Sequence, residues 1–353
     1  MFCQAIKLAA CALLASQLVS AQSVRIGVLG LFRPRQLELR ATLGAAIIIR
    51  AGESTFVLEP GSDRDVAQIR VSGSVMLLEV GELAVPVSEI FATSRTGGAA
   101  TFVLTIPHKI SRRYLGALDV RLISGVLVPV VTIDLETAVA SAVQAESVPG
   151  TPLEALKAQA VASRSYFTAG KGRHRNFDFC DTTHCQFLRD PPRAISLASV
   201  ATQTTRGLVL AYHDRPFATM FTRSCGGHSR TPEELGMPTQ DYPYFAVICD
   251  YCRRSSICWK RRIPQQDVTG LTANNEHSRL AIDHRLGWNA VPSNNFTYRI
   301  EGQDVILEGT GEGHGIGLCQ RGAKAMAEAG ADFRQILIHY YPNTTVVTAI
   351  HLH

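Results

Sequence analysis

The residues whose types and spacing could do chemistry are concentrated between Leu135 and Gln186. The run LETAVASAVQAES predicts a helix in which Val139, Val143 and Glu146 lie on one face. Because Glu146 is aligned with an apolar stripe and is close to the negative end of a helix, its carboxyl group should have a raised pKa. A carboxyl group that stays protonated near neutral pH can act as a general acid. The alternative is that Glu146 extends into solvent or caps the next helix.

A cluster of potential metal ligands follows in the run HRNFDFCDTTHCQF, which holds His174, Cys180, His184 and Cys185. Thiolate and imidazole ligands at this density suit a tetrahedral zinc ion, and the residues 181–183 are suitable turn material between them. A site closed by four protein ligands has no open position, so this zinc would be structural. The other interpretation is a disulfide between Cys180 and Cys185, with both histidines incidental.

A second helix should connect the acidic residue to this cluster. Thr151-Pro152-Leu153-Glu154 has the pattern of a helix start, with an N-cap threonine, a proline at the first helical position and a capping-box glutamate. The helix then runs through LEALKAQAVASRSYFTA to Gly170, which can end it. Lys157 and Arg164 share one face and could bind an anionic ligand or simply be solvated.

Two glycine-rich stretches lie further along the chain. SCGGHS at 224–229 predicts a tight turn at the end of a strand, and the run from Gly309 to Gly317 has glycine at every second position, so something packs closely against it. The run matches neither the dinucleotide-binding nor the Walker pattern, which disfavours phosphate binding. His314 within it is a candidate hydrogen-bond partner for a substrate or for Glu146, or a structural residue.

The remaining cysteines leave two interpretations open. If Cys180 and Cys185 hold a metal, five cysteines remain after position 22, and this odd number means that at least one is free or bound to a metal. Cys225, Cys249, Cys252 and Cys319 could form a second metal site, or disulfides could form among these four and Cys258. Basic residues next to Cys252 and Cys258 would suit a nucleic-acid-binding zinc knuckle in a cytosolic protein.

Four motifs together resemble one known family. The run from Glu146 to Tyr166, then CDTTHCQ, then SCGGHS, and finally GEGHGIGLCQRGAKAMA with ILIHYYPNT, resemble the stage II sporulation protein D family, which includes the amidase enhancers. The resemblance covers about residues 115–350. It implies a lytic transglycosylase that cleaves peptidoglycan glycan strands, with Glu146 at the family's catalytic glutamate and the Cys/His cluster at a zinc site known in some members.

The resemblance also implies roles for other residues. The CGGH turn would line the substrate cleft, which makes Ser224, Cys225 and His228 candidates for substrate contact. Arg164, Tyr166 and His314 would position the glycan strand. The expected reaction needs one carboxyl group, because the sugar's own C6 hydroxyl attacks and leaves a 1,6-anhydro end.

Three other functions remain open from the sequence. The protein could be a non-catalytic, glycan-binding enhancer of a cell-wall amidase. It could be a zinc hydrolase in which the Cys/His cluster is catalytic. A glycoside hydrolase with a second carboxylate, such as Glu312, is the third alternative.

The start of the chain has the features of an export signal. Lys7 precedes an apolar run from Leu8 to Val19, and Val19-Ser20-Ala21 fits a cleavage site, so residues 1–21 are expected to be a signal peptide. The run is too short to span a membrane. Export to the periplasm or cell envelope argues against nucleic acid as a partner. The modest net charge of +5 is compatible with the anionic polymers of an envelope.

Strand and helix patterns divide the mature chain into two parts and predict an α+β fold. Residues 22–131 read as short strands with period-two alternation and hold no cysteine, so a β-rich domain is expected there. Residues 132–353 should form a mixed α/β domain with helices at 194–205, 320–329 and 333–341. A polar helix is also expected in QQDVTGLTA, before a loop rich in Asn, Ser and Pro.

Overall fold

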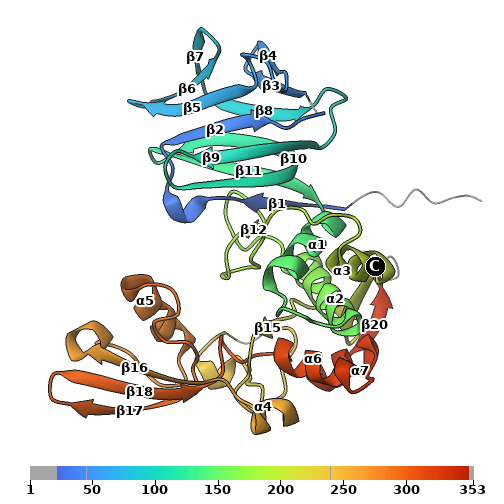
Figure 1. Ribbon diagram of the computed structural model, residues 1–353, viewed down its shortest axis with the longest axis vertical. Helices are drawn as coiled ribbons and strands as arrows, with labels where there is room; N and C mark the ends of the chain where they lie inside the picture. Colours follow the sequence, from blue (N-terminus) through green and yellow to red (C-terminus); the bar gives the residue numbers. More distant parts are fainter. Residues whose placement is uncertain (1–21, 45, 239, 350–353) are drawn as a thin grey trace, which may run out of the picture.

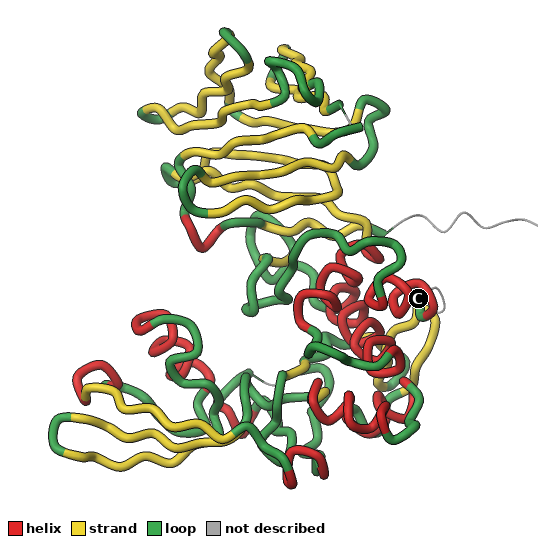
Figure 2. The backbone as a smooth tube through the Cα atoms, viewed as in Figure 1, coloured by secondary structure: helices red, strands yellow, loops and turns green. Residues whose placement is uncertain are grey.

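The computed structural model describes residues 22–44, 46–238 and 240–349, so the expected signal peptide lies outside the described residues. The fold is α+β, as the sequence predicts. A strand-rich part lies at the top of Figure 1, a group of helices lies below it, and a mixed lobe extends at the bottom. Figure 2 shows the same division by secondary structure. Among the described residues, no helix combines the length and apolarity that a membrane crossing needs.

One large sheet makes up the strand-rich part. Its strands are β1 (Ser23–Gly27), β2 (Gln36–Ala41), β3 (Ile47–Ala51), β4 (Ser54–Leu58), β5 (Val66–Ser72), β6 (Val75–Val80), β7 (Leu83–Val87), β8 (Glu89–Ser94), β9 (Ala100–Ile106), β10 (Ile110–Ile123), β11 (Val126–Asp134) and β12 (Phe179–Cys180), with a short 3-10 helix at Gly30–Phe32. Nine strands follow the order β12-β1-β11-β10-β9-β2-β5-β6-β7, while β8 pairs with β10 and β3, and β3 pairs with β4. In β9 buried and partly exposed residues alternate, which confirms the expected period of two.

The sheet continues past the expected domain boundary at 131. Strand β11 runs to Asp134, which then caps the next helix, because its Oδ1 accepts a hydrogen bond from the Thr137 amide at 3.0 Å. The strand β12 comes from the second half of the chain and pairs in parallel with β1, matching Ile26 with Phe179 and Gly27 with Cys180. The two halves therefore share one sheet.

Three helices pack beneath the sheet: α1 (Leu135–Glu146), α2 (Leu153–Ala169) and α3 (Leu197–Thr204) (Figure 1). The capping box expected at the start of α2 is absent. Glu154 instead accepts hydrogen bonds from Lys157 Nζ at 2.6 Å and from the Phe333 amide at 3.0 Å. The predicted end of α2 is confirmed, since the Gly170 amide donates to Tyr166 O.

Below α2 the chain forms small sheets and three further helices. These are the sheet of β13 (Leu208–Tyr212), β14 (Arg215–Pro216) and β20 (Thr345–Thr348), the pair β15 (Phe221–Thr222) and β19 (Leu318–Cys319), a 3-10 helix at Glu233–Leu235, and the helices α4 (Asp250–Arg254), α6 (Gln320–Glu328) and α7 (Phe333–Tyr340). The parallel pair β15 and β19 places the end of the glycine run beside the strand that leads into the SCGGHS turn.

The lower lobe has its own small core around Trp259 and Leu307. It consists of β16 (Cys258–Pro264), β17 (Phe296–Glu301), β18 (Asp304–Thr310) and α5 (Glu276–Leu286). The helix expected in QQDVTGLTA is only a 3-10 turn at Gln265–Val268, and α5 forms instead in the polar stretch that was expected to be a loop. The ion pairs of buried Arg279 with Glu276 and Asp283, at 2.7 and 2.9 Å, stabilise it without a strong apolar pattern.

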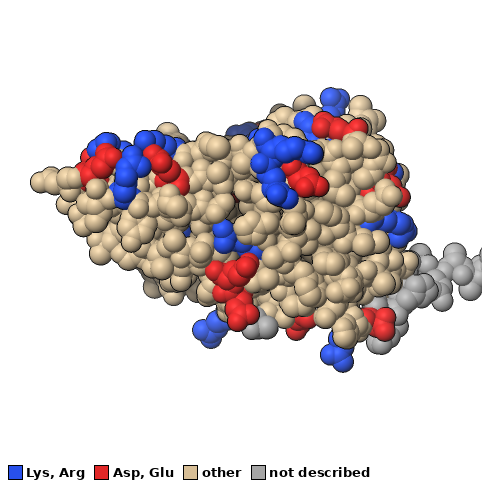
Figure 3. All heavy atoms as spheres, turned by 90° about the horizontal axis from the view of Figure 1, so that it is seen from below, with Lys and Arg blue, Asp and Glu red and all other residues tan. Residues whose placement is uncertain are grey.

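Most of the basic residues of this lobe have acidic partners. Lys260 pairs with Glu308 at 2.7 Å, and Arg262 pairs with Glu301 and Asp304 at 2.8 and 2.9 Å. Figure 3 views the molecule from below and shows blue and red side chains close together at the left end, rather than a continuous positive surface.

Candidate functional site

Glu146 is the last residue of α1, and the apolar face that precedes it is buried. Val139 and Val143 on that face are fully buried, whereas Glu146 is half-buried, so the sequence pattern placed the carboxyl group correctly at the margin of the core. Its Oε1 accepts a hydrogen bond of 2.7 Å from the main-chain amide of Phe187, which lies in the loop between β12 and α3. The side chain therefore has a fixed neighbour rather than open solvent around it.

The surroundings of Glu146 make it a weak acid by the standard of a glutamate. Burial raises the pKa of Glu146 to about 7, while the Phe187 amide and the positive charge of Arg223 oppose this rise. Arg223 also pairs with Glu312, at 3.2 Å between Nε and Oε2. A carboxyl group with a pKa near 7 can both donate and accept a proton at neutral pH.

Gln320, at the start of α6, holds the main chain of Glu146. Its Nε2 donates to the carbonyl oxygen of Glu146 at 2.9 Å and lies 3.4 Å from Oε1 of Gln159 on α2. Nearby buried polar atoms have no protein partner among the described residues: Gln159 Nε2, Ser163 Oγ and Gln186 Oε1. A polar strip therefore interrupts the alanine-rich face of α2 close to the carboxyl group.

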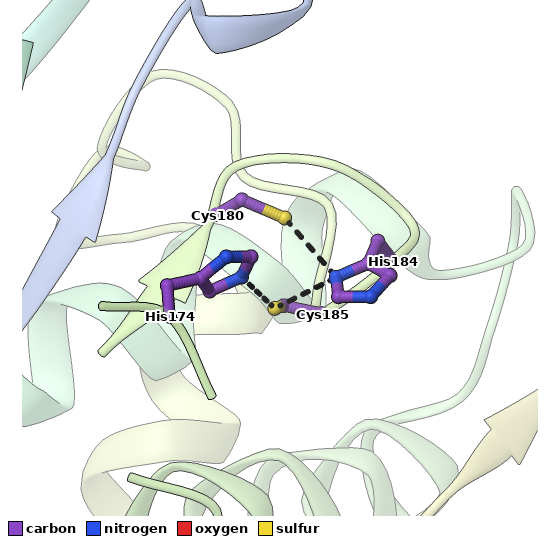
Figure 4. A group of neighbouring side chains, drawn as sticks. All are labelled: His174, Cys180, His184 and Cys185. Carbon is purple, nitrogen blue, oxygen red and sulfur yellow. Dashed lines mark hydrogen bonds between the residues drawn. The ribbon is translucent and has the colours of Figure 1, made fainter. Parts of the chain in front are cut away.

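The Cys/His cluster forms a compact donor set (Figure 4). The four ligand atoms of His174, Cys180, His184 and Cys185 all lie within 4.8 Å of one another. Nε2 of His174 is 3.3 Å from Sγ of Cys185, and Nδ1 of His184 is 3.7 and 3.5 Å from the two sulfur atoms. Both cysteines are free thiols. Bond lengths of about 2.1 Å to nitrogen and 2.3 Å to sulfur give nitrogen–sulfur edges of about 3.6 Å in a tetrahedron, so the donors fit zinc.

The cluster is attached to the N-terminal sheet. Cys180 is in β12, and the next residue, Asp181, is buried and accepts hydrogen bonds from the Leu29 amide at 3.1 Å and from Arg112 at 2.7 Å. Cys185 precedes Phe187 by two residues. The segment that contains the donor residues therefore also contains the main-chain amide that donates to Glu146. The geometry of the cluster and the environment of the carboxyl group are therefore linked.

Two residues expected to contact a substrate are instead part of the core. The side chain of Arg164 is 1% exposed and pairs with Glu136 through Nε and Nη2, at 2.9 and 2.7 Å. Tyr166 is buried against Phe167 and Phe179. Neither can touch a polymer at the surface, so these two predictions are wrong.

The other predicted contacts of α2 and the SCGGHS turn differ among themselves. Lys157 is partly exposed but is paired with Glu154 on its own helix. Ser224 is buried, and its main chain pairs with Glu312 in both directions, at 3.0 and 2.8 Å, so its predicted contact with substrate is wrong. His228 is exposed beside a surface hollow that Gly226 and Arg253 also line, so it remains a candidate.

His314 lies in the glycine run but not at the carboxyl group. Its Nδ1 accepts a hydrogen bond from the Ile316 amide at 3.0 Å, and burial lowers its pKa below the usual value. Glu276 of the lower lobe is among the charges that act on its ring. In the described part of the chain, no hydrogen bond joins His314 to Glu146. The geometry therefore favours the structural role.

Comparison with known proteins identifies the family. Residues 124–212 match the family model described as Stage II sporulation protein. An uncharacterized protein of Brachyspira hyodysenteriae is 30% identical over 268 residues, covering 66% of this chain and 72% of the relative. The stage II sporulation protein D of Bacillus amyloliquefaciens is 23% identical over 249 residues, covering 56% and 69%. The chain belongs to the stage II sporulation protein D and amidase-enhancer family. The amidase enhancer of Bacillus subtilis is 41% identical over 63 residues, which are 18% of this chain and 9% of that protein.

Sequence reasoning missed three groups that act on Glu146 of this stage II sporulation protein D relative: the Phe187 amide and Arg223 at its carboxyl group, and Gln320 at its main chain. A main-chain amide carries no side-chain signature. Arg223 directly precedes the SCGGHS motif, two residues before Cys225, and Gln320 lies within the GEGHGIGLCQRGAKAMA motif, one residue after Cys319. Their positions beside cysteines were the signal that could have identified them.

Proposed function

We propose that this protein is an exported lytic transglycosylase that cleaves the glycan strands of peptidoglycan between N-acetylmuramic acid and N-acetylglucosamine. The observation that carries the proposal is the half-buried Glu146 carboxyl group, whose pKa of about 7 suits a group that first donates and then accepts a proton. The names of the relatives, stage II sporulation protein D and amidase enhancer, support a role at the cell wall and a location in the envelope.

In this mechanism Glu146 serves twice. Protonated Glu146 donates to the glycosidic oxygen as the bond to the muramic acid C1 breaks, and the carboxylate that remains takes the proton of the C6 hydroxyl as its oxygen attacks C1. The Phe187 amide and Arg223 stabilise the carboxylate formed in between. Glu312, the other carboxylate considered from the sequence, is engaged in an ion pair with Arg223 at 3.2 Å.

A zinc ion held by His174, Cys180, His184 and Cys185 would be structural. The ion would supply a cross-link and neutralise the two thiolates, and the four donors leave no open position for a substrate. The chain's own contribution is to keep residues 185–187 in place, so that the Phe187 amide points at Glu146. This arrangement speaks against the zinc hydrolase that the sequence left open.

The test is digestion of denuded glycan strands by the purified protein, with mass analysis of the products. The expected product ends in a 1,6-anhydro ring, 18 Da lighter than a hydrolysed end because no water is added. Glu146→Gln should abolish the product while circular dichroism stays unchanged, and Glu328→Gln, an exposed acid on α6, should leave it. Reducing ends from the wild-type protein would instead show hydrolysis and contradict the proposal.

A second candidate function rests on the 63-residue similarity to the amidase enhancer. In that case the protein binds glycan strands and stimulates a cell-wall amidase without cutting the strands itself. The result that would favour it is release of stem peptides by an amidase that accelerates with this protein, equally well with Glu146→Gln, together with intact glycan strands.

A further inference from the structure

Four further cysteines come together in the part of the chain below α2. Cys225 follows β15, Cys249 and Cys252 lie at the start of α4, and Cys319 ends β19. All four are buried, and their sulfur atoms lie within 4.8 Å of one another. Three chain segments, up to 94 residues apart, therefore converge on one point.

The spacing of the sulfur atoms suits a metal better than disulfides. With zinc–sulfur bonds of about 2.3 Å, a tetrahedron has sulfur–sulfur edges of about 3.8 Å. Sγ of Cys252 and Sγ of Cys319 are 3.5 Å apart, and all four residues are free thiols. Cys249 and Cys252 have the two-residue spacing typical of zinc sites. Two separate disulfides would not require all four sulfur atoms to lie around one point, whereas a metal ion with four thiolate ligands does.

Hydrogen-bond donors surround the sulfur atoms. The amides of Cys225 and Gly322 both donate to Sγ of Cys319, each at 3.4 Å. The Ser224 hydroxyl is 3.5 Å from Sγ of Cys252, and the Tyr340 hydroxyl is 3.4 Å from Sγ of Cys249. Metal-bound thiolates carry negative charge and are stabilised by such neighbours, so these donors would support four thiolate ligands of a metal ion.

The backbone around the cluster is shaped to admit it. A Cβ added at Gly322 would lie 2.6 Å from Sγ of Cys249 and would overlap the Tyr340 hydroxyl. Only glycine therefore lets α6 approach the sulfur atoms at this distance.

We propose that Cys225, Cys249, Cys252 and Cys319 bind a zinc ion with four thiolate ligands, a second metal centre separate from the Cys/His cluster. Four soft thiolates in tetrahedral geometry select zinc or iron, and zinc adds no redox chemistry to a structural site. The ion joins the SCGGHS turn, α4 and the end of the glycine run into one rigid body.

This centre also supports the surroundings of Glu146, a point that rests on the proposed function. Cys225 is two residues from Arg223, and Cys319 is followed directly by Gln320. Arg223 and Gln320 contribute charge and a hydrogen bond to Glu146. The four cysteines are therefore positioning residues, which act on Glu146 only through these two neighbours.

The first experiment counts metal in the purified full-length protein and does not depend on activity. Inductively coupled plasma mass spectrometry should find two zinc ions per chain in the wild-type protein. Cys249→Ser/Cys252→Ser and Cys180→Ser/Cys185→Ser should each lower the count to one. Cys258→Ser, at an exposed cysteine outside both groups, should leave it at two. One zinc in the wild-type protein, lost only with Cys180 and Cys185, would overturn the proposal.

The second experiment does not require a variant of the new site to fold. Cobalt is loaded into Cys180→Ser/Cys185→Ser, which keeps only the four-cysteine cluster. The expected spectrum has the intense sulfur-to-cobalt charge-transfer bands and tetrahedral d–d bands of a four-thiolate site. The same protein is also alkylated and digested without reductant. Mass analysis should then show no disulfide-linked peptides that contain these four cysteines. Linked peptides, a cobalt spectrum without thiolate bands, or iron in place of zinc would each contradict the assignment.

Discussion

The main-chain amide of Phe187 donates a 2.7 Å hydrogen bond to Oε1 of Glu146, across 41 residues of sequence. This contact joins the end of α1 to the loop that carries the Cys/His cluster. It stabilises the ionised carboxylate and so opposes the effect of burial on its pKa.

Activity should fall as the pH rises through about 7, because the first step needs protonated Glu146. Above that value the rate of anhydro-product release should drop about tenfold per pH unit, as expected for one ionisation. Arg223→Gln removes a positive charge that lowers the Glu146 pKa, so the alkaline limb should move to higher pH. Rates measured from pH 5 to 9 test this, with the exposed Arg254→Gln as the control. A limb that stays in place in Arg223→Gln would show that another group titrates.

Stability should depend on pH through the same group. The folded-state pKa of Glu146 is raised from 4.5 to about 7, so the folded protein binds more protons between these values and loses stability as the pH rises through that window. Glu146→Gln removes this loss. It should raise the free energy of unfolding at pH 8 by on the order of 1 kcal/mol, after allowance for partial exposure, and change it little at pH 4. Urea unfolding at both pH values provides the comparison, and equal effects at the two pH values would contradict the raised pKa.

Loss of the Cys/His cluster should loosen Phe187. In Cys180→Ser/Cys185→Ser, residues 185–187 lose their attachment, so amide hydrogen exchange at Phe187 should accelerate by about tenfold or more. Exchange mass spectrometry of peptides from this loop measures the effect, and peptides from β9 provide an internal reference. Unchanged protection at Phe187 in a zinc-free sample would mean that the cluster does not hold the loop.

The buried ion pair should matter for folding and not for glycan binding. Arg164→Met leaves Glu136 charged without its partner and should cost about 3 to 5 kcal/mol of unfolding free energy. Arg164→Met/Glu136→Gln should recover part of this loss. Affinity for glycan strands, measured on the folded fraction, should equal that of the wild-type protein. A selective loss of affinity in the stable double variant would restore a substrate role for Arg164.

Gly322→Ala should destabilise the protein although alanine favours helices. The added Cβ would overlap the Tyr340 hydroxyl and press on Sγ of Cys249, which should cost about 2 kcal/mol and lower zinc content. Gly322→Ala/Tyr340→Phe should regain part of the stability. Gly30→Ala, where a Cβ meets nothing within 4 Å, is the control. Thermal unfolding of the four proteins tests this, and a stabilised Gly322→Ala would show that the space is not as tight as the structure indicates.

Local patterns in the sequence were enough to predict α1, α2 and the strands of the N-terminal sheet. They were enough because the period-two and helical spacings of apolar residues, and the glycine at 170 that ends α2, involve residues that are close in the sequence. The His174 to Cys185 donors were also predictable, since they lie within one short loop.

The rest depends on contacts between distant residues. Lys157 and Arg164 look alike on a helical projection, yet Arg164 is buried because Glu136, 28 residues earlier, neutralises it. The helix α5 has no strong apolar face and depends on the charges around Arg279. Sequence spacing alone could not decide between a second metal site and disulfides, because the cysteine sulfur atoms meet only after three segments have folded.

The two-residue strand β12 limits how this protein can be divided or recombined. Phe179 and Cys180 pair with β1, and Asp181 is satisfied by Leu29 and Arg112, all from the N-terminal sheet. A shorter protein that begins at Leu135 would retain every candidate ligand of the Cys/His cluster. It would lack β1, Leu29 and Arg112, which hold the loop that contains these ligands. A chimera that exchanges the sheet with that of a relative must therefore also exchange the loop 170–187, because the loop and the sheet make specific contacts with each other.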